Sequence, residues 1–181
     1  MTGEPDGYVR VTSSRTVYEN RWMVVREDRT ILPDGSPGLY AVVVKPPAAT
    51  IVACDDGHVW LVEQYRHPVG ERFWEVPQGA WEDAPNAAPE ELARGELAEE
   101  TGLRAAHMRR LGRQFFAYGI SSQPYDVWLA TGLTEGEQAL EDTEQGLRVG
   151  RFAHDEVVAM VRDGRIADAA SVASLGLAGL L

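Results

Sequence analysis

The chain has 181 residues and a formal net charge of −11, from 28 acidic and 17 basic side chains. This length fits one domain with a sizeable core and a small appended subdomain, and the negative charge argues against nucleic acid bound through a basic surface. The single cysteine, Cys54, excludes an internal disulfide framework and favours a reducing compartment. No apolar run has the length needed to span a membrane, and residues 1–7 lack a signal-peptide pattern. We therefore expect a cytoplasmic protein that binds neither nucleic acid nor a membrane.

The first part of the chain predicts a small β subdomain. Residues 1–7 are rich in Gly, Pro and acids, which indicates a disordered tail. Residues 8–45 alternate short strand-like stretches with turns, and we predict strands at 15–18, 21–25 and 39–44. About three short strands are too few to be stable alone, so this subdomain must pack on the rest of the chain or on a partner subunit.

The remaining residues, 46–181, interleave strands and helices without a regular βαβ repeat. Two apolar strands flank Asp55-Asp56-Gly57, which is a strong hairpin signal. Asn86 is a suitable N-cap for a helix that runs to Thr101. Further strands are predicted at 113–118, 126–131 and 147–152, an acidic loop at 132–146, and helices at 155–161 and 168–181. This pattern predicts the α+β class, with a mixed sheet covered by helices.

Residues 95–103 place three carboxylates within five positions. If the stretch is helical, Glu96, Glu99 and Glu100 share one narrow face, because successive residues turn by about 100°. Gly102 suits a left-handed C-terminal cap. At a spacing of about 5 Å, each pair of like charges costs on the order of 3 kcal/mol, and a bound divalent cation reverses that sign. Oxygen ligands favour Mg²⁺ or Mn²⁺ over zinc; the alternative is an ordinary solvated helix face.

With Gly79, this stretch resembles the Nudix box, G-x5-E-x7-R-E-U-x-E-E-x-G-U, in which U is aliphatic. Residues 74–79, Trp-Glu-Val-Pro-Gln-Gly, are similar to the W-E-(L/V/F)-P-x-G entry to that box. Residues 64–66, residues 163–169 and the strand-rich N-terminal segment resemble the ADP-ribose pyrophosphatase branch of the family. The likeness covers residues 10–181.

The chain departs from the box in three places. Gly79 and Gly102 lie 23 positions apart, where the family pattern has 21, so the loop carries two extra residues. Ala87 stands at the first glutamate of the box, and Gly95 stands at the arginine that steadies the catalytic glutamates in the family. Close packing against another backbone is one reason for a glycine inside a helix, where it costs about 1 kcal/mol. Candidates to replace the arginine are Arg94, Arg109 and Arg110.

The resemblance implies a Nudix fold, in which a mixed sheet is sandwiched between helices (α/β/α), with a small N-terminal antiparallel β subdomain. That subdomain, residues 8–45, is expected to serve dimerisation and base binding, so we expect a homodimer. The implied metal ligands are Glu96, Glu99, Glu100 and the carbonyl of Gln78, holding Mg²⁺ or alternatively Mn²⁺. Glu99 is also a candidate catalytic base. A second catalytic acid is expected from the acidic loop: Glu144 first, then Glu141 or Asp142, unless the loop is only a solvated surface.

Three further residues are candidates for substrate binding. Arg66 suits a phosphate clamp, because a guanidinium binds phosphate oxygens through two hydrogen bonds. The alternative for Arg66 is a structural ion pair with Glu75, which we also assign to the substrate site. Trp22 is expected to stack on a base or, alternatively, to pack in a core.

The resemblance implies attack of water on the diphosphate of ADP-ribose or a related nucleotide sugar, assisted by Mg²⁺. The products would be a nucleoside monophosphate and a sugar phosphate. Two alternatives stay open. One is a Nudix hydrolase of dinucleoside polyphosphates or capped RNA; the other is a catalytically weak Nudix-fold ligand-binding or regulatory domain, for which Gly95 and Ala87 are the support.

Overall fold

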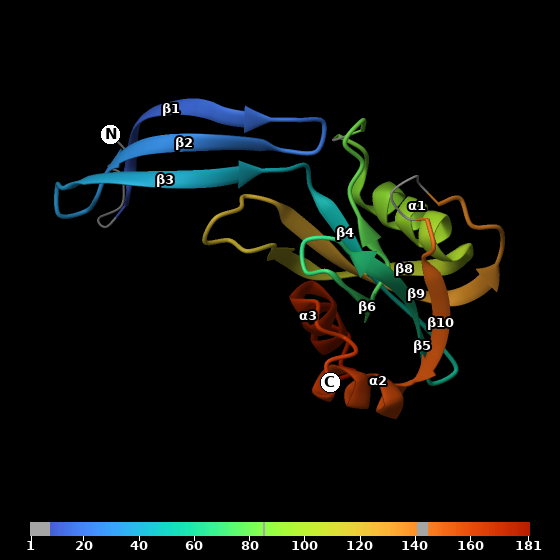
Figure 1. Ribbon diagram of the computed structural model, residues 1–181. Coiled ribbons are helices and arrows are strands. Elements are labelled where there is room, and N and C mark those ends of the chain that lie inside the picture. Colours follow the sequence, from blue (N-terminus) through green and yellow to red (C-terminus); the bar gives the residue numbers. More distant parts are fainter. Residues whose placement is uncertain (1–7, 85, 141–144) are drawn as a thin grey trace. The chain divides into compact units, whose positions relative to one another are not determined.

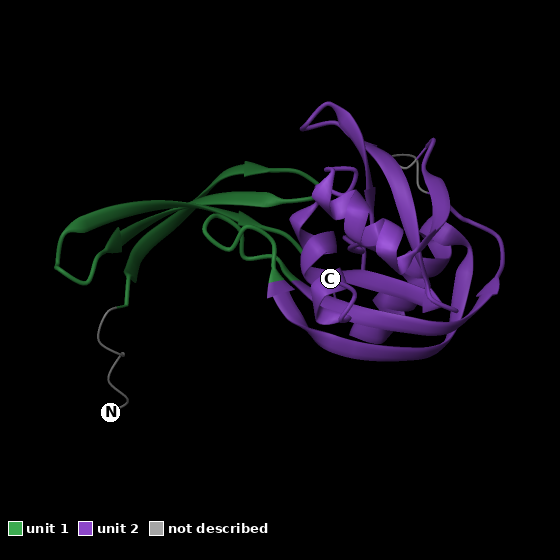
Figure 2. Ribbon diagram, turned by 90° about the horizontal axis from the view of Figure 1, so that it is seen from below, with its two compact units in different colours: residues 1–46, 115–124 green, residues 47–114, 125–181 purple. Residues whose placement is uncertain are grey.

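The computed structural model describes residues 8–84, 86–140 and 145–181. The predicted tail at residues 1–7 lies outside the described residues. The chain divides into two compact units: unit 1 comprises residues 1–46 and 115–124, and unit 2 comprises residues 47–114 and 125–181 (Figure 2).

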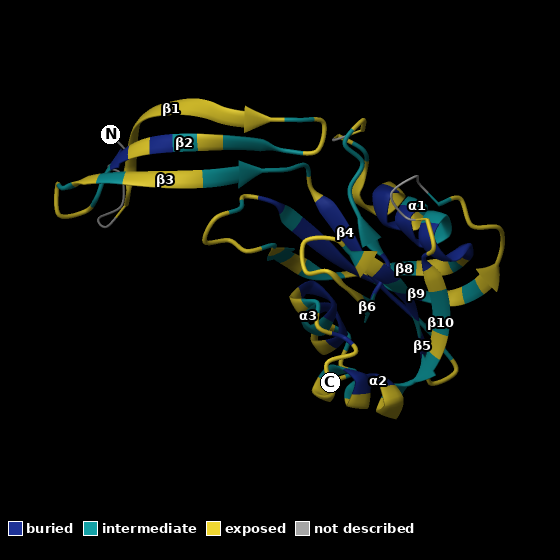
Figure 3. Cartoon of the chain, viewed as in Figure 1, coloured by how far each residue is buried: buried dark blue, intermediate teal, exposed yellow. Residues whose placement is uncertain are grey.

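Unit 1 contains an antiparallel sheet in the order β1-β2-β3, formed by Arg10–Glu19, Val24–Ile31 and Pro37–Val44 (Figure 1). This sheet confirms the predicted N-terminal β subdomain fold, although its strands are longer than the sequence indicated. The pairing of Arg10 with Ile31 extends β1 and β2 well past the apolar residues on which the prediction rested. Every residue of β1 is exposed (Figure 3). Segment 115–124 joins this unit, where the Val43 N–H donates to the Ile120 carbonyl at 2.8 Å.

Unit 2 is built on a mixed sheet in the order β10-β5-β4-β9-β8, with β6 paired to β5 and β7 paired to β4. Strands β4 and β9 are parallel, whereas β5 pairs antiparallel with β4, β6 and β10. The predicted hairpin is present between β4 and β5, where Asp56 and Gly57 both have positive φ. The strands are β4 Ala48–Asp55, β5 His58–Arg66, β6 Glu71–Glu75, β7 Gln78–Gly79, β8 Leu103–Phe115, β9 Pro124–Glu135 and β10 Arg148–Ala153.

Helices cover both faces of this sheet: α1 (Pro89–Thr101) on one, and α2 (His154–Arg162) and α3 (Ala169–Leu177) on the other (Figure 1). Side chains alternate between the two faces of a strand. Ile51 of β4 therefore packs in a cluster with Leu97 of α1, while its neighbour Val52 packs with Met160 of α2 and Leu175 of α3. This arrangement is the predicted α+β fold with a sheet sandwiched between helices.

Several element ends differ from the sequence prediction. Helix α1 begins at Pro89 with Ala88 as its N-cap, so Asn86 is not the cap; proline is favoured at the first helical position because its missing N–H needs no partner there. Strand β8 begins directly after Gly102, well before the strand predicted at 113–118. Its many arginines hid the strand pattern in the sequence. Strand β9 extends to Glu135, so the acidic loop starts later than the predicted residue 132. Helix α3 ends at Leu177, before the predicted end at residue 181. Across the described part of the chain, no helix has both the length and the apolarity to cross a membrane.

Candidate functional site

The short strand β7 is fixed at the centre of the unit 2 sheet. Gln78 pairs with Thr50 and Gly79 pairs with Ala49, both on β4. The Ile51 N–H donates to the Pro77 carbonyl at 2.9 Å, which extends the pairing by one more bond. The backbone of residues 77–79 is therefore held by the core of the domain, and its position does not depend on loop geometry.

Helix α1 carries two buried carboxylates to β7. Glu100 is 1% exposed, and its Oε2 accepts a hydrogen bond from the backbone N–H of Gln78 at 3.0 Å. Glu96, one turn earlier, is 5% exposed, and its carboxylate lies against the α-carbon of Gly79. A Cβ at position 79 would overlap this carboxylate, coming within 2.7 Å of Oε1. Glycine at this position thus allows the helix acid to approach the strand.

Glu99 points to a different neighbour. Its half-buried side chain accepts a hydrogen bond at Oε2 from the indole Nε1–H of Trp81 at 3.4 Å. The ring of Trp81 lies over Gly95, where a Cβ would overlap Cζ2 and come within 2.7 Å of Cη2. The expected reason for this glycine, close approach of another backbone, is therefore wrong, because an indole side chain occupies the space.

Two of the arginines considered as replacements for the box arginine are engaged elsewhere. Arg94 binds Glu90 at 2.9 Å and the carbonyl of Ala105 at 2.7 Å. Arg110 binds Asp126 at 2.7 Å. Their guanidinium groups thus stabilise the outer side of α1 and the β8–β9 pair.

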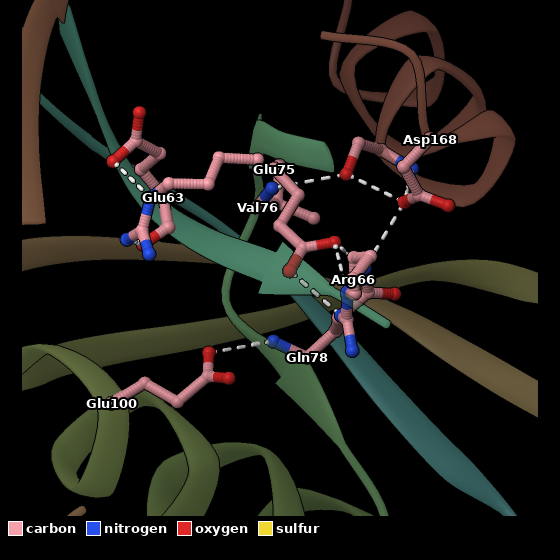
Figure 4. A network of polar contacts seen from close by, with 9 residues as sticks. Glu63, Arg66, Glu75, Val76, Gln78, Glu100 and Asp168 are labelled. Carbon is pink, nitrogen blue, oxygen red and sulfur yellow. Dashed lines mark hydrogen bonds and ion pairs between the residues drawn. The ribbon is translucent and has the colours of Figure 1, made fainter. Parts of the chain in front are cut away.

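A second acidic group adjoins β7 from the opposite side (Figure 4). Glu75 is 1% exposed and forms an ion pair with Arg66, with Oε1 at 2.7 Å from Nη2. The side-chain amide of Gln78 donates to Glu75 at 3.1 Å and to Asp168 at 3.0 Å. Burial raises the pKa of Glu75, and the charge of Arg66 opposes that rise. The ion pair considered as the alternative role of Arg66 is therefore formed, while 42% of the Arg66 side chain stays exposed.

The same network fixes the C-terminal helix, and the sequence prediction did not include its members in the site. Asp168 is the N-cap of α3 and accepts from the backbone N–H of Ser171 at 2.8 Å. The Ser171 hydroxyl in turn accepts from the Val76 N–H at 3.0 Å. Aspartate is a favoured N-cap residue, so the sequence contained the signal for this cap. The contacts of Asp168 with Gln78 and of Ser171 with Val76 join distant segments and had no such signal.

The described carboxylates around β7 have the chemistry to bind a divalent cation, but they are not arranged as a complete metal site. Within residues 8–84, 86–140 and 145–181, no three Asp, Glu, His or Cys side chains form a group that could hold a metal ion. Glu100 nevertheless meets Gln78 of β7, and Glu96 meets the adjacent Gly79, which leaves the space that a side chain would fill. Carboxylate and carbonyl oxygens are the ligands that hard cations prefer, so the donor set fits.

The remaining predicted residues lie in the acidic loop and in unit 1. Glu141, Asp142 and Glu144 lie outside the described residues. On either side of them, the Ala139 N–H donates to the Glu99 carbonyl at 3.0 Å and the Gly146 carbonyl accepts from Arg72 at 2.7 Å.

Trp22 lies in the turn between β1 and β2 of unit 1. Its side chain is 43% exposed, and the guanidinium of Arg21 lies 5.2 Å from its ring centroid. Trp22 is therefore partly exposed and is not packed in a core.

A sheet sandwiched by helices, with a glutamate-bearing helix over a Trp-Glu-Val-Pro-Gln-Gly segment, defines the class of protein as a Nudix domain. The family model described as the NUDIX domain matches residues 44–174, and the model described as the nucleoside diphosphate sugar hydrolase N-terminal domain matches residues 9–43. The chain belongs to the Nudix family, and the enzyme class predicted from the sequence, a Nudix pyrophosphohydrolase, is confirmed.

Three relatives and one solved structure are similar to this chain over most of its length. The chain is 35% identical over 171 residues to an ADP-ribose pyrophosphatase of Mycobacterium tuberculosis, covering 93% of this chain and 80% of the relative. It is 28% identical over 140 residues to an ADP-ribose pyrophosphatase of Bacillus subtilis (76% and 75%), and 26% identical over 165 residues to a methanol dehydrogenase activator of Bacillus methanolicus (90% and 88%). A solved structure titled as an ADP compounds hydrolase superposes with a TM-score of 0.82 at 21% identity, covering 97% of this chain and 95% of that one. This last likeness supports the fold.

Proposed function

We propose that this Nudix enzyme hydrolyses the diphosphate of ADP-ribose or a related nucleotide sugar in a Mg²⁺-dependent reaction. The observation that carries the proposal is the meeting of Glu96 and Glu100 with β7, which brings two buried carboxylates to one short backbone segment. The named activities of the Mycobacterium tuberculosis and Bacillus subtilis relatives support this substrate class. Nudix hydrolases generally depend on a divalent metal, and an acidic chain needs one to accept an anionic diphosphate.

In the proposed reaction, the oxygen of water bonds to one phosphorus and the bridging P–O bond breaks, so that two phosphate monoesters form. Glu96, Glu99, Glu100 and the carbonyl of Gln78 would hold Mg²⁺. When bound, the ion supplies charge neutralisation of the diphosphate and a lowered pKa for the attacking water. The Gln78 N–H keeps the carboxylate of Glu100 in place, and Gly79 admits that of Glu96. Glu99 or Glu144 would accept the proton of the water, as the resemblance implies.

Substrate binding is assigned to side chains that are partly exposed. Arg66 would contact the phosphates through its half-exposed guanidinium, while Glu75 fixes the orientation of that guanidinium. Trp22 would stack on the base through its partly exposed ring. The sheet of unit 1 exposes several large hydrophobic side chains, namely Val11, Val17, Tyr18, Leu39 and Tyr40. They support a homodimer formed through unit 1, because exposed apolar patches mark interfaces.

The test is an assay of nucleotide sugars, dinucleoside polyphosphates and capped RNA with Mg²⁺, comparing wild type with Glu100→Gln. We expect turnover of ADP-ribose or a related nucleotide sugar, and a loss of at least about 100-fold in kcat for the variant, the scale found when one stabilising group of a transition state is removed. Glu91→Gln is the matched control, because Glu91 is exposed in the first turn of the same helix.

Each alternative has its own outcome in this assay. If capped RNA or a dinucleoside polyphosphate were turned over in preference, that compound would replace nucleotide sugars as the proposed substrate. Binding of ADP-ribose in a calorimeter, without turnover of any compound, would favour the regulatory domain. Turnover that Glu100→Gln leaves unchanged would overturn the metal assignment.

A further inference from the structure

Trp81 and Gly95 form a matched pair beside the predicted metal ligands. Trp81 belongs to the loop that is two residues longer than the family pattern. Its indole fills the space over Gly95, where even a methyl group would overlap the ring. From that position Nε1–H donates to Glu99 Oε2 at 3.4 Å. The lengthened loop therefore places Trp81 in contact with both the glycine at position 95 and the box glutamate Glu99.

We propose that Trp81 is a positioning residue for Glu99, and that Trp81 and Gly95 together replace the arginine of the Nudix box. The family pattern places an arginine at position 95, where it steadies the glutamates. Here position 95 carries no side chain, and the donor that steadies Glu99 is the indole N–H of Trp81 from the loop. The inference rests on the proposed function, since Glu99 is assigned there as a metal ligand or base.

The packing of the indole suits this role. Trp81 packs against the core cluster that contains Leu92 and Leu97 of α1 and Ile51 of β4. A ring with two side-chain torsions, held by a core, loses little further entropy when it fixes a carboxylate. Long side chains such as arginine lose about 2 kcal/mol of rotamer freedom in the same role.

The chemistry of the donor also differs from that of the arginine. Indole has one N–H donor, no acceptor and no charge. It can orient one oxygen of Glu99 while leaving the negative charge of the carboxylate in place, whereas a guanidinium would neutralise it. A carboxylate that keeps its full charge attracts a divalent cation more strongly. Trp81 therefore orients Glu99 without competing with the cation.

The test compares four variants with wild type: Trp81→Phe, Trp81→Ala, Gly95→Arg and the double variant Trp81→Ala/Gly95→Arg. Activity is resolved into kcat and KM, and Mn²⁺ binding is followed by the electron paramagnetic resonance signal of the free ion, which needs no substrate. Trp81→Phe keeps an aromatic ring but removes the donor. We expect kcat to fall about 3- to 10-fold with KM nearly unchanged, and Mn²⁺ to bind several-fold more weakly, since the hydrogen bond is long, at 3.4 Å, and a hydrogen bond of ordinary strength has this order of effect.

The double variant tests the replacement itself. Gly95→Arg alone forces an arginine into the space of the indole, so we expect a lowered urea midpoint and at least about a tenfold loss of kcat. In the Trp81→Ala background the space is empty, and the arginine should restore kcat and Mn²⁺ affinity above those of Trp81→Ala alone. A merely structural tryptophan would not give this rescue.

Trp60→Phe is the matched control, because Trp60 packs against the same core cluster and, among the described residues, its Nε1 has no hydrogen-bond partner. It should leave kcat and Mn²⁺ affinity unchanged. The inference is overturned if Trp81→Phe matches wild type in both measurements, or if the double variant is no better than Trp81→Ala. A wild type without turnover would instead contradict the proposed function, and the Mn²⁺ measurements would still decide the role of Trp81.

Discussion

The sheets of unit 1 and unit 2 use similar strands but bury them very differently. Every residue of β1 in unit 1 is exposed, whereas Ala48 to Ala53 of β4 in unit 2 are all buried (Figure 3). A strand covered on both faces forms a rigid support, and catalytic groups attached to such a support are held within the small tolerances that chemistry needs. A strand open to solvent keeps its side chains available for a partner. We therefore expect catalysis in unit 2, and base recognition and contacts between copies in unit 1.

The charged residues follow this division in part, since Asp28 on β2 of unit 1 is also buried and pairs with Arg26. In unit 2 the buried carboxylates of Glu75 and Asp126 each accept hydrogen bonds from arginine. In unit 1 the ion pair between Arg15 of β1 and Glu27 of β2 is more exposed. Exposed pairs contribute little to stability, while buried ones fix geometry. Four substitutions, each paired with a control, test this division.

The largest effect is expected from a single methyl group at the site. Gly79→Ala places a Cβ within the carboxylate of Glu96, which must move away from β7. We expect kcat/KM to fall at least about 100-fold, on the scale of misplacing a catalytic group by about 1 Å. The measurement is steady-state hydrolysis of the best substrate from the compound panel.

Gly119→Ala in unit 1 is the control for this change. Among the described residues no atom lies within 4 Å of a Cβ at position 119. Activity and stability should remain those of wild type. If Gly79→Ala also retains wild-type kcat/KM, then the contact between Glu96 and β7 does not matter for the reaction.

The second substitution compares one chemical change in the two sheets. Val52→Ala removes two methyl groups from a fully buried position on β4, and we expect the free energy of unfolding to fall by about 2 kcal/mol. Val17→Ala makes the same change on β1, where the side chain is 47% exposed, and should cost less than about 0.5 kcal/mol. Urea unfolding at several protein concentrations measures both. A larger, concentration-dependent cost for Val17→Ala would place β1 in an interface between copies.

Much of the fold could be predicted because unit 2 follows simple rules. The apolar strands on either side of Asp55-Asp56-Gly57 and the glycine after Thr101 each specify one local structure, and the structure contains both. The missed region was β8, whose residues are largely exposed and whose arginines break the alternation. A strand stabilised by pairing, with little burial, leaves a weak pattern in the sequence.

The helix of the site, its contact with the segment at residues 77–79 and the Arg66–Glu75 ion pair were predictable, but its loop contacts were not. Spacing alone placed Glu96 and Glu100 on one face of α1, and both meet β7. No spacing rule brings Trp81 to Gly95, because the path of the intervening loop decides that contact. Asp168 likewise reaches Gln78 from 90 positions away. Contacts between distant segments depend on tertiary packing, which a motif does not encode.

The third substitution concerns a buried ion pair of unit 2. Burial raises the pKa of Asp126, but hydrogen bonds from Arg113 and Arg110 outweigh burial and hold the pKa below its ordinary value. A lowered carboxyl pKa adds stability that is present above the unfolded pKa and is lost as pH falls through the folded one. Asp126→Asn should therefore lower the free energy of unfolding by about 1.5 kcal/mol at neutral pH. The gap between variant and wild type should close as pH falls below about 4.

Glu27→Gln is the control for Asp126→Asn, because Glu27 pairs with Arg15 on the exposed sheet of unit 1. Its pKa is also lowered, mainly by the hydrogen bond from Arg15, yet solvent screens the pair. Urea midpoints of this variant and wild type should agree at every pH. A difference from wild type as large as that of Asp126→Asn would show that unit 1 is not the open structure described here.

The smallest effect is expected from unit 1 and concerns binding alone. Trp22→Ala removes the ring that we propose stacks on the base, and KM should rise about fivefold, equivalent to about 1 kcal/mol, with kcat unchanged. Tyr40→Ala is the control, because Tyr40 has the same 43% exposure in the same unit and no proposed role in the site. Steady-state kinetics separate the two parameters. A fall in kcat for Trp22→Ala would contradict the division of labour, because it would give the exposed unit a part in the chemical step.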